Sequence, residues 1–135
     1  MFIDACVIIS IITGEETAAA YDAALVDADS ACTSPMAAWE AVIVLSRADH
    51  LNCSYTAAQS VVVEWLEARQ IALREPISPR EILSHAVAVA EKHGLGKRHL
   101  SNFDCFHYAH AKAAGVPLLT LDQLLRETDV ETVPA

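Results

Sequence analysis

The stretch MFIDACVII, residues 1–9, decides the fold and raises the first question about function. Its apolar residues predict a buried opening strand over residues 1–4, reaching Cys6 at most, before a short helix. Asp4 interrupts this run, and burying a carboxylate without compensation costs several kcal/mol. The first arginine or lysine in the chain is Arg47. Either a distant cation or a bound metal ion must therefore offset the charge of Asp4.

The composition fits one compact domain over residues 1–135, large enough to bury a core without stabilising metals or disulfides. The hydrophobic fraction is 53%, which favours a well-filled interior or a buried dimer face. The net charge of −9 and the pI of about 4.9 exclude broad binding of nucleic acid through a basic face. They do not exclude a nuclease, because catalytic acids add negative charge, and they suit a partner segment rich in arginine.

The sequence predicts a cytoplasmic protein that does not enter a membrane. No apolar run reaches the roughly 18 residues of a membrane span, and the first residues lack the basic start of a signal peptide. The four cysteines form no CxxC pair, so neither a zinc knuckle nor a redox dithiol is indicated. We expect reduced and mostly buried thiols.

The chain reads as alternating strands and helices, without repeats or linkers. Ser34-Pro35 and Ser78-Pro79 mark helix starts, because serine caps free N–H groups and proline suits the first helical position. Strands are expected at residues 1–4, 31–33, 71–75, 116–120 and 130–133, helices at 15–27, 34–50, 56–69, 78–93 and 101–114, and a loop at 94–100. Strands separated by helices pair in parallel, so we predict an α/β fold, a three-layer α/β/α sandwich with a mainly parallel sheet.

Four acids fall where such a sheet gathers its functional groups, beyond the carboxyl ends of the strands. Asp4 ends the first strand, and Glu40 lies nearly two turns into the helix after the second. Asp104 opens the helix before the strand at 116–120, and Asp122 follows that strand. Their joint placement predicts one acidic cluster.

Each acid also has a purely structural interpretation. Asp104 lies three residues after Ser101, which is the spacing of a capping box. Asp122 fits a turn or the cap of a following short helix. Glu40 fits a solvated helix face, whereas Asp4 has the weakest structural explanation, since a strand interior is a poor place for an unpaired charge.

Clustered carboxylates point to metal-ion chemistry. Close carboxylates repel one another, and a cation relieves that repulsion. Oxygen-only ligands select hard cations, so Mg²⁺ or Mn²⁺ is expected. Such an ion lowers the pKa of bound water and offsets charge on phosphate oxygens, which suits phosphodiester hydrolysis.

Four segments in order resemble the PIN-domain ribonucleases, and among them the VapC toxins of type II toxin–antitoxin systems. They are MFIDACVII at the start, TSPMAAWEAV around Glu40, NFDCFHYAHAKAAGVPLLT around Asp104, and LLTLD at Asp122. Each segment is short, but the ordered set spans nearly the whole chain. The resemblance implies a PIN-like fold, endoribonuclease activity dependent on Mg²⁺ or Mn²⁺, a VapB-type antitoxin partner and a homodimer.

Carried over by position, the resemblance makes Asp4, Glu40 and Asp104 the main metal ligands and catalytic acids, with Asp122 as the fourth acid. Two departures from the family pattern bear on this assignment. The chain has NFDC without the usual glycine, so Asn102 or Ser101 takes the polar role there. LDQLL replaces the GDDF of many relatives, which leaves Asp129 as the alternative fourth acid.

Substrate contacts are expected beside the acids. Lys97, Arg98 and His99 form the one compact basic run, which suits either RNA phosphates or a solvated loop. The resemblance also implies that Thr33 or Ser34 orients a ligand or a water.

Other notable side chains have mainly structural explanations. We expect His107 or His110 to line the cleft and the other to face the core or solvent, with metal ligation the lesser possibility. Trp39 and Trp65 are expected in the core or a dimer face. The stripe formed by Val61, Val62, Trp65 and Leu66 is expected in the core, with part available to a dimer or antitoxin groove.

Two other functional classes compete with a ribonuclease toxin. A receiver-like signalling domain also uses Mg²⁺ and acids, but it needs an acidic pair after the first strand and a lysine after a late one, which the sequence lacks. A non-catalytic binding module with an acidic, Mg²⁺-binding pocket is disfavoured by the presence of all four acids. Loss of RNA cleavage on Asp4→Asn would separate an enzyme from either alternative.

Overall fold

A five-stranded, entirely parallel sheet forms the centre of the molecule. The computed structural model describes residues 1–75, 77–94 and 97–135. The strands are β1 (Phe2–Ile3), β2 (Cys32–Thr33), β3 (Ala72–Leu73), β4 (Leu118–Leu119) and β5 (Thr132–Val133). Their order across the sheet is β3-β2-β1-β4-β5, so the chain reverses its direction of winding between β1 and β4. Ligand sites of open parallel sheets lie at such a reversal.

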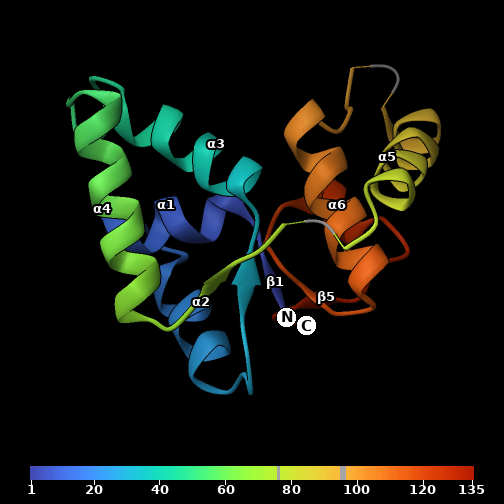
Figure 1. Cartoon of the computed structure of the whole chain (residues 1–135), viewed down its shortest axis with the longest axis horizontal. Helices are drawn as coiled ribbons and strands as arrows, with labels where there is room; N and C mark the ends of the chain where they lie inside the picture. The colour runs from blue at the N-terminus through green and yellow to red at the C-terminus, as the bar shows by residue number, and fades with distance from the viewer. Residues whose placement is uncertain (76, 95–96) are drawn as a thin grey trace.

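Helices cover both faces of the sheet, which confirms the predicted three-layer α/β/α sandwich. The helices are α1 (Ala5–Thr13), α2 (Ala18–Val26), α3 (Pro35–Ser46), α4 (Tyr55–Ala68), α5 (Pro79–His93), α6 (Asn102–Ala114) and α7 (Gln123–Arg126). Figure 1 shows α1 to α4 on one side of the strands and α5 with α6 on the other. Because both faces are covered, the central strands β1 and β4 bury side chains on each side.

Alternation along the strands divides the core in two. Ile3 and Leu119 are neighbours in register and pack with α1 to α4, while Phe2 and Leu118 are neighbours and pack with α5, α6 and α7. Successive strand residues point to opposite faces, so β1 and β4 each contribute one residue to each half of the core.

The serine-capped helix starts occur as predicted from the sequence. The side chains of Ser34, Ser78 and Ser101 accept hydrogen bonds from backbone N–H groups in the first turns of α3, α5 and α6. Pro35 and Pro79 occupy the first turns of α3 and α5, where no N–H is needed.

Three predicted boundaries are wrong. The opening strand ends at Ile3, because the Asp4 side chain accepts from Cys6 N and α1 begins at once. The helix predicted at 15–27 starts at Ala18, since the chain first makes a turn after Gly14, whose φ of 70° ends α1. The helix predicted to reach residue 50 ends at Ser46, where the backbone becomes extended.

The predicted aromatic and aliphatic core residues divide between interior and surface. Val62 and Leu66 are buried and Trp65 packs at the edge of the core, but Trp39 is 46% exposed and lies edge-on to Tyr55. The loop predicted at 94–100 includes residues 95–96, which lie outside the described residues. Within the described ranges, none of the helices combines the length and the apolar character that crossing a membrane requires.

Candidate metal centre at the end of β1

Asp4 lies at the carboxyl end of β1, where the direction of winding reverses. Its N–H donates to the Leu119 carbonyl at 3.3 Å, and in this register Asp4 and Thr120 follow the paired residues Ile3 and Leu119. Asp4 is 3% exposed. The expected buried carboxylate therefore exists, although it caps a helix instead of ending a longer strand.

Two side chains orient the Asp4 carboxylate through Oδ2. The Thr120 hydroxyl donates to Oδ2 at 2.8 Å, and the Cys6 thiol donates to it at 3.0 Å. Burial and then the charge of Asp4 raise the pKa of Cys6 far above its ordinary range, so the sulfur keeps its proton. Tyr21 supports Cys6, since its hydroxyl lies 3.2 Å from the sulfur and accepts from Leu121 N at 3.0 Å. The other oxygen, Oδ1, faces His107.

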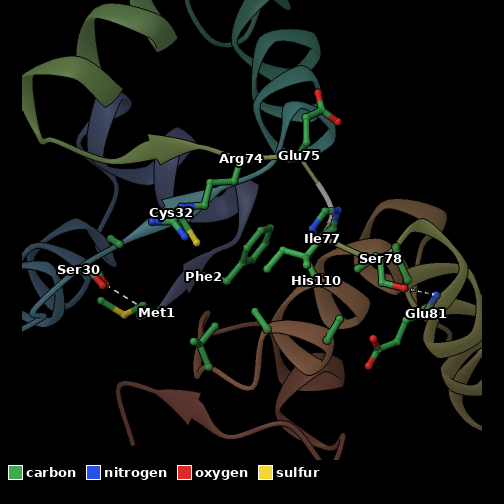
Figure 2. Close-up of a pocket in the computed structure, with 15 residues that line it drawn as sticks. Met1, Phe2, Ser30, Cys32, Arg74, Glu75, Ile77, Ser78, Glu81 and His110 are labelled. Carbon is green, nitrogen blue, oxygen red and sulfur yellow. Dashed lines mark hydrogen bonds between the residues drawn. The ribbon is translucent and has the colours of Figure 1, made fainter.

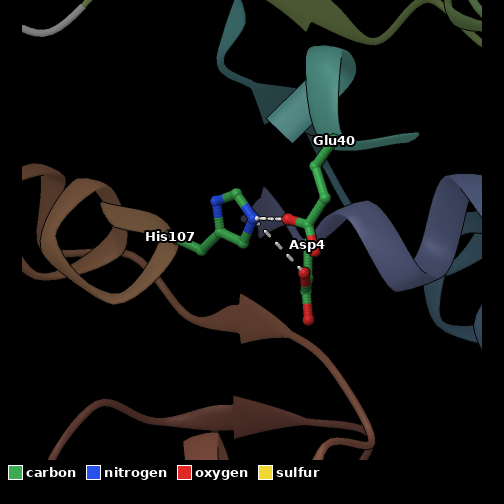
Figure 3. A group of neighbouring side chains, drawn as sticks. All are labelled: Asp4, Glu40 and His107. Carbon is green, nitrogen blue, oxygen red and sulfur yellow. Dashed lines mark hydrogen bonds and ion pairs between the residues drawn. The ribbon is translucent and has the colours of Figure 1, made fainter. Parts of the chain in front are cut away.

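Glu40 and His107 converge on Asp4 from two different helices (Figure 3). His107 Nε2 lies 2.6 Å from Glu40 Oε2 and 3.7 Å from Asp4 Oδ1. The Glu40 side chain is 23% exposed, whereas His107 is fully buried. Donor atoms of these three residues lie within 4.8 Å of one another, which makes them the group in the described chain that is best arranged to hold an ion.

The acids set the charge state of the His107 imidazole. Burial by itself lowers its pKa, but the hydrogen bond to Glu40 and the charges of Asp4, Glu40 and Asp104 outweigh burial and raise it. The raised pKa favours a protonated ring, so His107 is a candidate for the distant cation that was one of the two alternatives for compensating Asp4.

Asp104 lies at the start of α6 and belongs to the same electrostatic centre. Its Oδ2 accepts from Ser101 N at 3.1 Å, and the Ser101 hydroxyl accepts from Asp104 N, so the capping box forms. Burial and then the charge of Asp4 raise the pKa of Asp104. The structural role and the functional placement of Asp104 thus coexist.

Asp122 and Asp129 lie outside this group. Asp122 is exposed and caps α7, its Oδ1 accepting from Leu124 N at 2.9 Å and Leu125 N at 3.0 Å. Its own N–H donates to Thr120 Oγ1 at 3.1 Å, and because that hydroxyl donates to Asp4 Oδ2, Thr120 links the two aspartates. Asp129 accepts from Tyr108 and from Lys112, both at 2.7 Å. Of the two candidates for the fourth acid, Asp122 is therefore connected to Asp4 by hydrogen bonds, whereas Asp129 binds residues in the second half of α6.

The expected substrate-binding residues occupy helix starts and one surface segment. Ser34 is buried and caps α3, while Asn102 is exposed at the first position of α6. The Thr33 hydroxyl donates to the Ile3 carbonyl at 3.0 Å, so its proton is used in a bond between neighbouring strands. Lys97 and Arg98 are both exposed, and Arg98 pairs with Glu127 at 3.3 Å.

A pocket of about 230 Å³ lies between the sheet and the α5–α6 pair but contains none of the four acids. Figure 2 shows Phe2 and His110 at its wall, and their rings stack with centroids 5.3 Å apart. Burial and then the charge of His107 lower the pKa of His110. His110 therefore packs against Phe2 at this pocket, whereas His107 is fully buried and lies against Asp4 and Glu40.

The donor set fits a divalent cation. Donor atoms of Asp4, Glu40 and His107 lie within 4.8 Å of one another. Burial and then the charge of Asp4 raise the pKa of Asp104, so these two carboxylates repel each other. A cation removes that repulsion, and carboxylate oxygens are the ligands that hard cations prefer. The ring nitrogen of His107 adds a donor that the all-oxygen expectation did not include.

Fold and site together define an α/β domain with an acidic centre at the reversal of its sheet. The chain belongs to the PIN domain family, whose sequence model matches residues 1–131. None of the curated proteins compared with the chain matches it.

Solved structures share the fold across nearly the whole chain. VapBC2 from Rickettsia felis, bound to a promoter DNA fragment, superposes with a TM-score of 0.70 at 14% identity, over 97% of this chain and 94% of the other. FitAcB from Neisseria gonorrhoeae gives 0.60 at 18% identity, with 97% and 94% covered. PAE2754 from Pyrobaculum aerophilum gives 0.61 at 20% identity, with 96% and 85% covered. At these identities the likeness establishes the fold.

Sequence reasoning missed the residues that hold Asp4 in place. Thr120 and Cys6 come from opposite ends of the chain, and neither carries a motif of its own. Thr120 could have been found from the parallel register, which places it beside Asp4. His107 carried a clearer signal, since three residues after Asp104 on a helix place both side chains on one face.

Proposed function

We propose that the protein is a metal-dependent endoribonuclease that acts as the toxin of a cytoplasmic toxin–antitoxin pair. The observation that carries this proposal is the convergence of Asp4 and Glu40, with His107, at the end of β1 in a PIN-family chain, with Asp104 near enough for the charge of Asp4 to raise its pKa. Asp4 and Asp104 each cap a helix start, but those caps do not require the acids of β1, α3 and α6 to approach one another. Their repulsion is a cost that a bound cation offsets.

Asp4, Glu40 and Asp104 would hold the ion, which is Mg²⁺ or Mn²⁺, with Asp122 as the fourth acid. Asp4 is the best fixed of them, because Thr120 and Cys6 hold Oδ2 and leave Oδ1 toward the site. A divalent cation bound there supplies a Lewis acid that activates water and offsets charge on the scissile phosphate.

The chain's own residues would position the RNA. Lys97 and Arg98 are exposed ahead of α6 and suit contacts with backbone phosphates, which orient a nucleic acid without reading its sequence. Asn102 and Ser34 lie at the starts of the helices that carry Asp104 and Glu40. In-line hydrolysis breaks the bond between phosphorus and the 3′-oxygen, leaving a 5′-phosphate and a 3′-hydroxyl.

A VapB-type antitoxin is the proposed partner, and a homodimer the proposed assembly. Two of the structural neighbours are VapBC2 and FitAcB. The net charge of −9 suits an antitoxin segment with arginines, one of which would pair with the acids in place of an ion.

RNA cleavage tests the proposal. Purified wild-type protein, Asp4→Asn and Asp27→Asn are incubated with total RNA in Mg²⁺, Mn²⁺ or EDTA, and the product ends are determined. Asp27 caps the end of α2, is exposed and serves as the matched carboxylate control. We expect ion-dependent cleavage by wild type and Asp27→Asn and none by Asp4→Asn. Equal cleavage by all three proteins would overturn the assignment, and a lack of cleavage by any would favour a binding module.

A further inference from the structure

His107 is the one member of the candidate metal centre to which the proposed function gives no role. It lies on α6, one turn after Asp104, and its side chain is fully buried. Figure 3 shows the ring directed at Glu40 and Asp4 instead of into the apolar core. Nε2 lies 2.6 Å from Glu40 Oε2 and 3.7 Å from Asp4 Oδ1.

The burial of His107 has a free-energy cost, which its packing alone does not explain. Nδ1 is buried and has no hydrogen-bond partner among the described residues. A buried polar group without a partner costs about 1–3 kcal/mol, which an apolar side chain of similar size would avoid. The rings of Phe2 and Phe103 lie 6.3 Å and 6.5 Å from the imidazole, so packing fixes the ring plane and leaves Nε2 aimed at the acids.

The three donor atoms lie within 4.8 Å of one another, which is close enough for ligands of one ion. In an octahedral site with ligands at about 2.1 Å, neighbouring donors are about 3 Å apart and opposite donors about 4.2 Å apart. The observed separations of 2.6 Å and 3.7 Å from Nε2 need only small adjustments to meet that geometry.

We infer that His107 Nε2 is a direct nitrogen ligand of the cation held by Asp4 and Glu40, so that the centre prefers a first-row transition ion over Mg²⁺. The inference rests on the proposed metal dependence and refines the identity of the ion. Mg²⁺ strongly favours oxygen ligands, whereas imidazole binds first-row transition ions well. Mn²⁺ accepts both donor types and is the probe used below.

The competing role for His107 is that of an internal cation, in which a protonated ring substitutes for the ion between Asp4 and Glu40. The two roles predict opposite effects when the ring is removed. If His107 is a ligand, its loss weakens the binding of Mn²⁺ more than the binding of Mg²⁺, because Mg²⁺ depends less on a nitrogen donor. Loss of a competing positive charge strengthens binding of both ions.

Pulsed electron paramagnetic resonance of the Mn²⁺-loaded, full-length wild-type protein tests the ligand directly. We expect nuclear modulation from a coordinated ¹⁴N that disappears when the protein is labelled with ¹⁵N-histidine. His107→Ala and the matched control His110→Ala are then compared by titration with Mn²⁺ and Mg²⁺, with circular dichroism as the check on folding. We expect His107→Ala to lose on the order of tenfold or more in Mn²⁺ affinity and His110→Ala to bind as wild type does.

Each outcome decides between the possibilities. Bound Mn²⁺ without histidine nitrogen modulation, or higher affinity for both ions in His107→Ala, overturns the inference. RNA cleavage in the same preparation would then leave the proposed function standing. Nitrogen coordination without any RNA cleavage supports the ligand and removes the ribonuclease. A wild-type protein that binds neither ion overturns both, and the labelling result stands even where His107→Ala does not fold.

Discussion

Thr120→Val tests whether a second residue positions the Asp4 carboxylate. Thr120 is fully buried, and its hydroxyl donates to Asp4 Oδ2 at 2.8 Å. The change keeps the size of the side chain and removes a hydrogen bond to a charged group, which is worth about 1.5–3 kcal/mol. The hydroxyl also accepts from Asp122 N at 3.1 Å, but Asp122 is exposed and water can replace that bond.

Thr33→Val is the matched control. Thr33 is equally buried and ends the neighbouring strand β2, but its hydroxyl donates to the Ile3 carbonyl, an uncharged acceptor. Such a bond contributes about 1 kcal/mol. The free energy of unfolding in EDTA should therefore fall by about 1.5–3 kcal/mol for Thr120→Val and about 1 kcal/mol for Thr33→Val. At roughly 3 °C per kcal/mol for a chain of this size, the Tm values fall by about 5–9 °C and 3 °C.

Ion binding separates positioning from simple stability. Without Thr120 the Asp4 carboxylate is less well oriented, so we expect Mn²⁺ affinity to fall on the order of tenfold, as is common for residues that orient metal ligands. Thr33→Val should change this affinity little. Equal Tm losses in the two variants, or unchanged Mn²⁺ affinity in Thr120→Val, would refute the positioning role.

Three further predictions follow from the same contacts. The pKa of Asp104 is raised by burial and by the charge of Asp4, so its ionisation makes the folded protein less stable as pH rises through that pKa. Asp104→Asn should therefore stabilise the ion-free protein at pH 7 by roughly 1 kcal/mol, and it should abolish RNA cleavage. A lower Tm of Asp104→Asn in EDTA would count against this. Asp129 has its pKa lowered to about 2 by Lys112 and Tyr108, so its contribution is present above pH 4 and lost between about pH 4 and 2. Because Asp129 is exposed, Asp129→Asn should cost less than about 1 kcal/mol at pH 5 and nothing near pH 2 in denaturant titrations, and a constant difference would be inconsistent with this pairing. Mn²⁺ at about 100 times its Kd should stabilise the wild-type protein by about 2.7 kcal/mol and leave the Tm of Asp4→Asn unchanged, whereas equal shifts would place the ion elsewhere.

Local chemistry explains which parts of the fold could be predicted. Three helices begin directly after a capping serine, and their starts occur as expected from the sequence. The serines are Ser34, Ser78 and Ser101. The run after Asp4 is apolar on all sides, so it has no helical periodicity to separate it from a strand. Only the contact between Asp4 and the N–H of Cys6 starts α1 there, and that contact was not evident from the pattern.

The candidate site was predictable where topology places its residues. Asp4 and Glu40 follow neighbouring parallel strands, and that rule alone places them near each other. Glu40 and His107 are 67 residues apart, so their 2.6 Å contact depends on how α3 and α6 pack. The tie of Asp129 to Lys112 likewise depends on packing, since no local pattern distinguishes Asp129 from Asp122 as the fourth acid.

The central claim is that Asp4 at the end of β1, Glu40 of α3 and Asp104 of α6 hold one divalent cation. Anomalous diffraction from crystals grown with Mn²⁺ locates the ion without reference to activity. The account predicts one strong anomalous peak within coordination distance of Asp4 and Glu40, and its loss in Asp4→Asn crystals. An ion bound elsewhere, or a peak that persists without the Asp4 carboxylate, would contradict it.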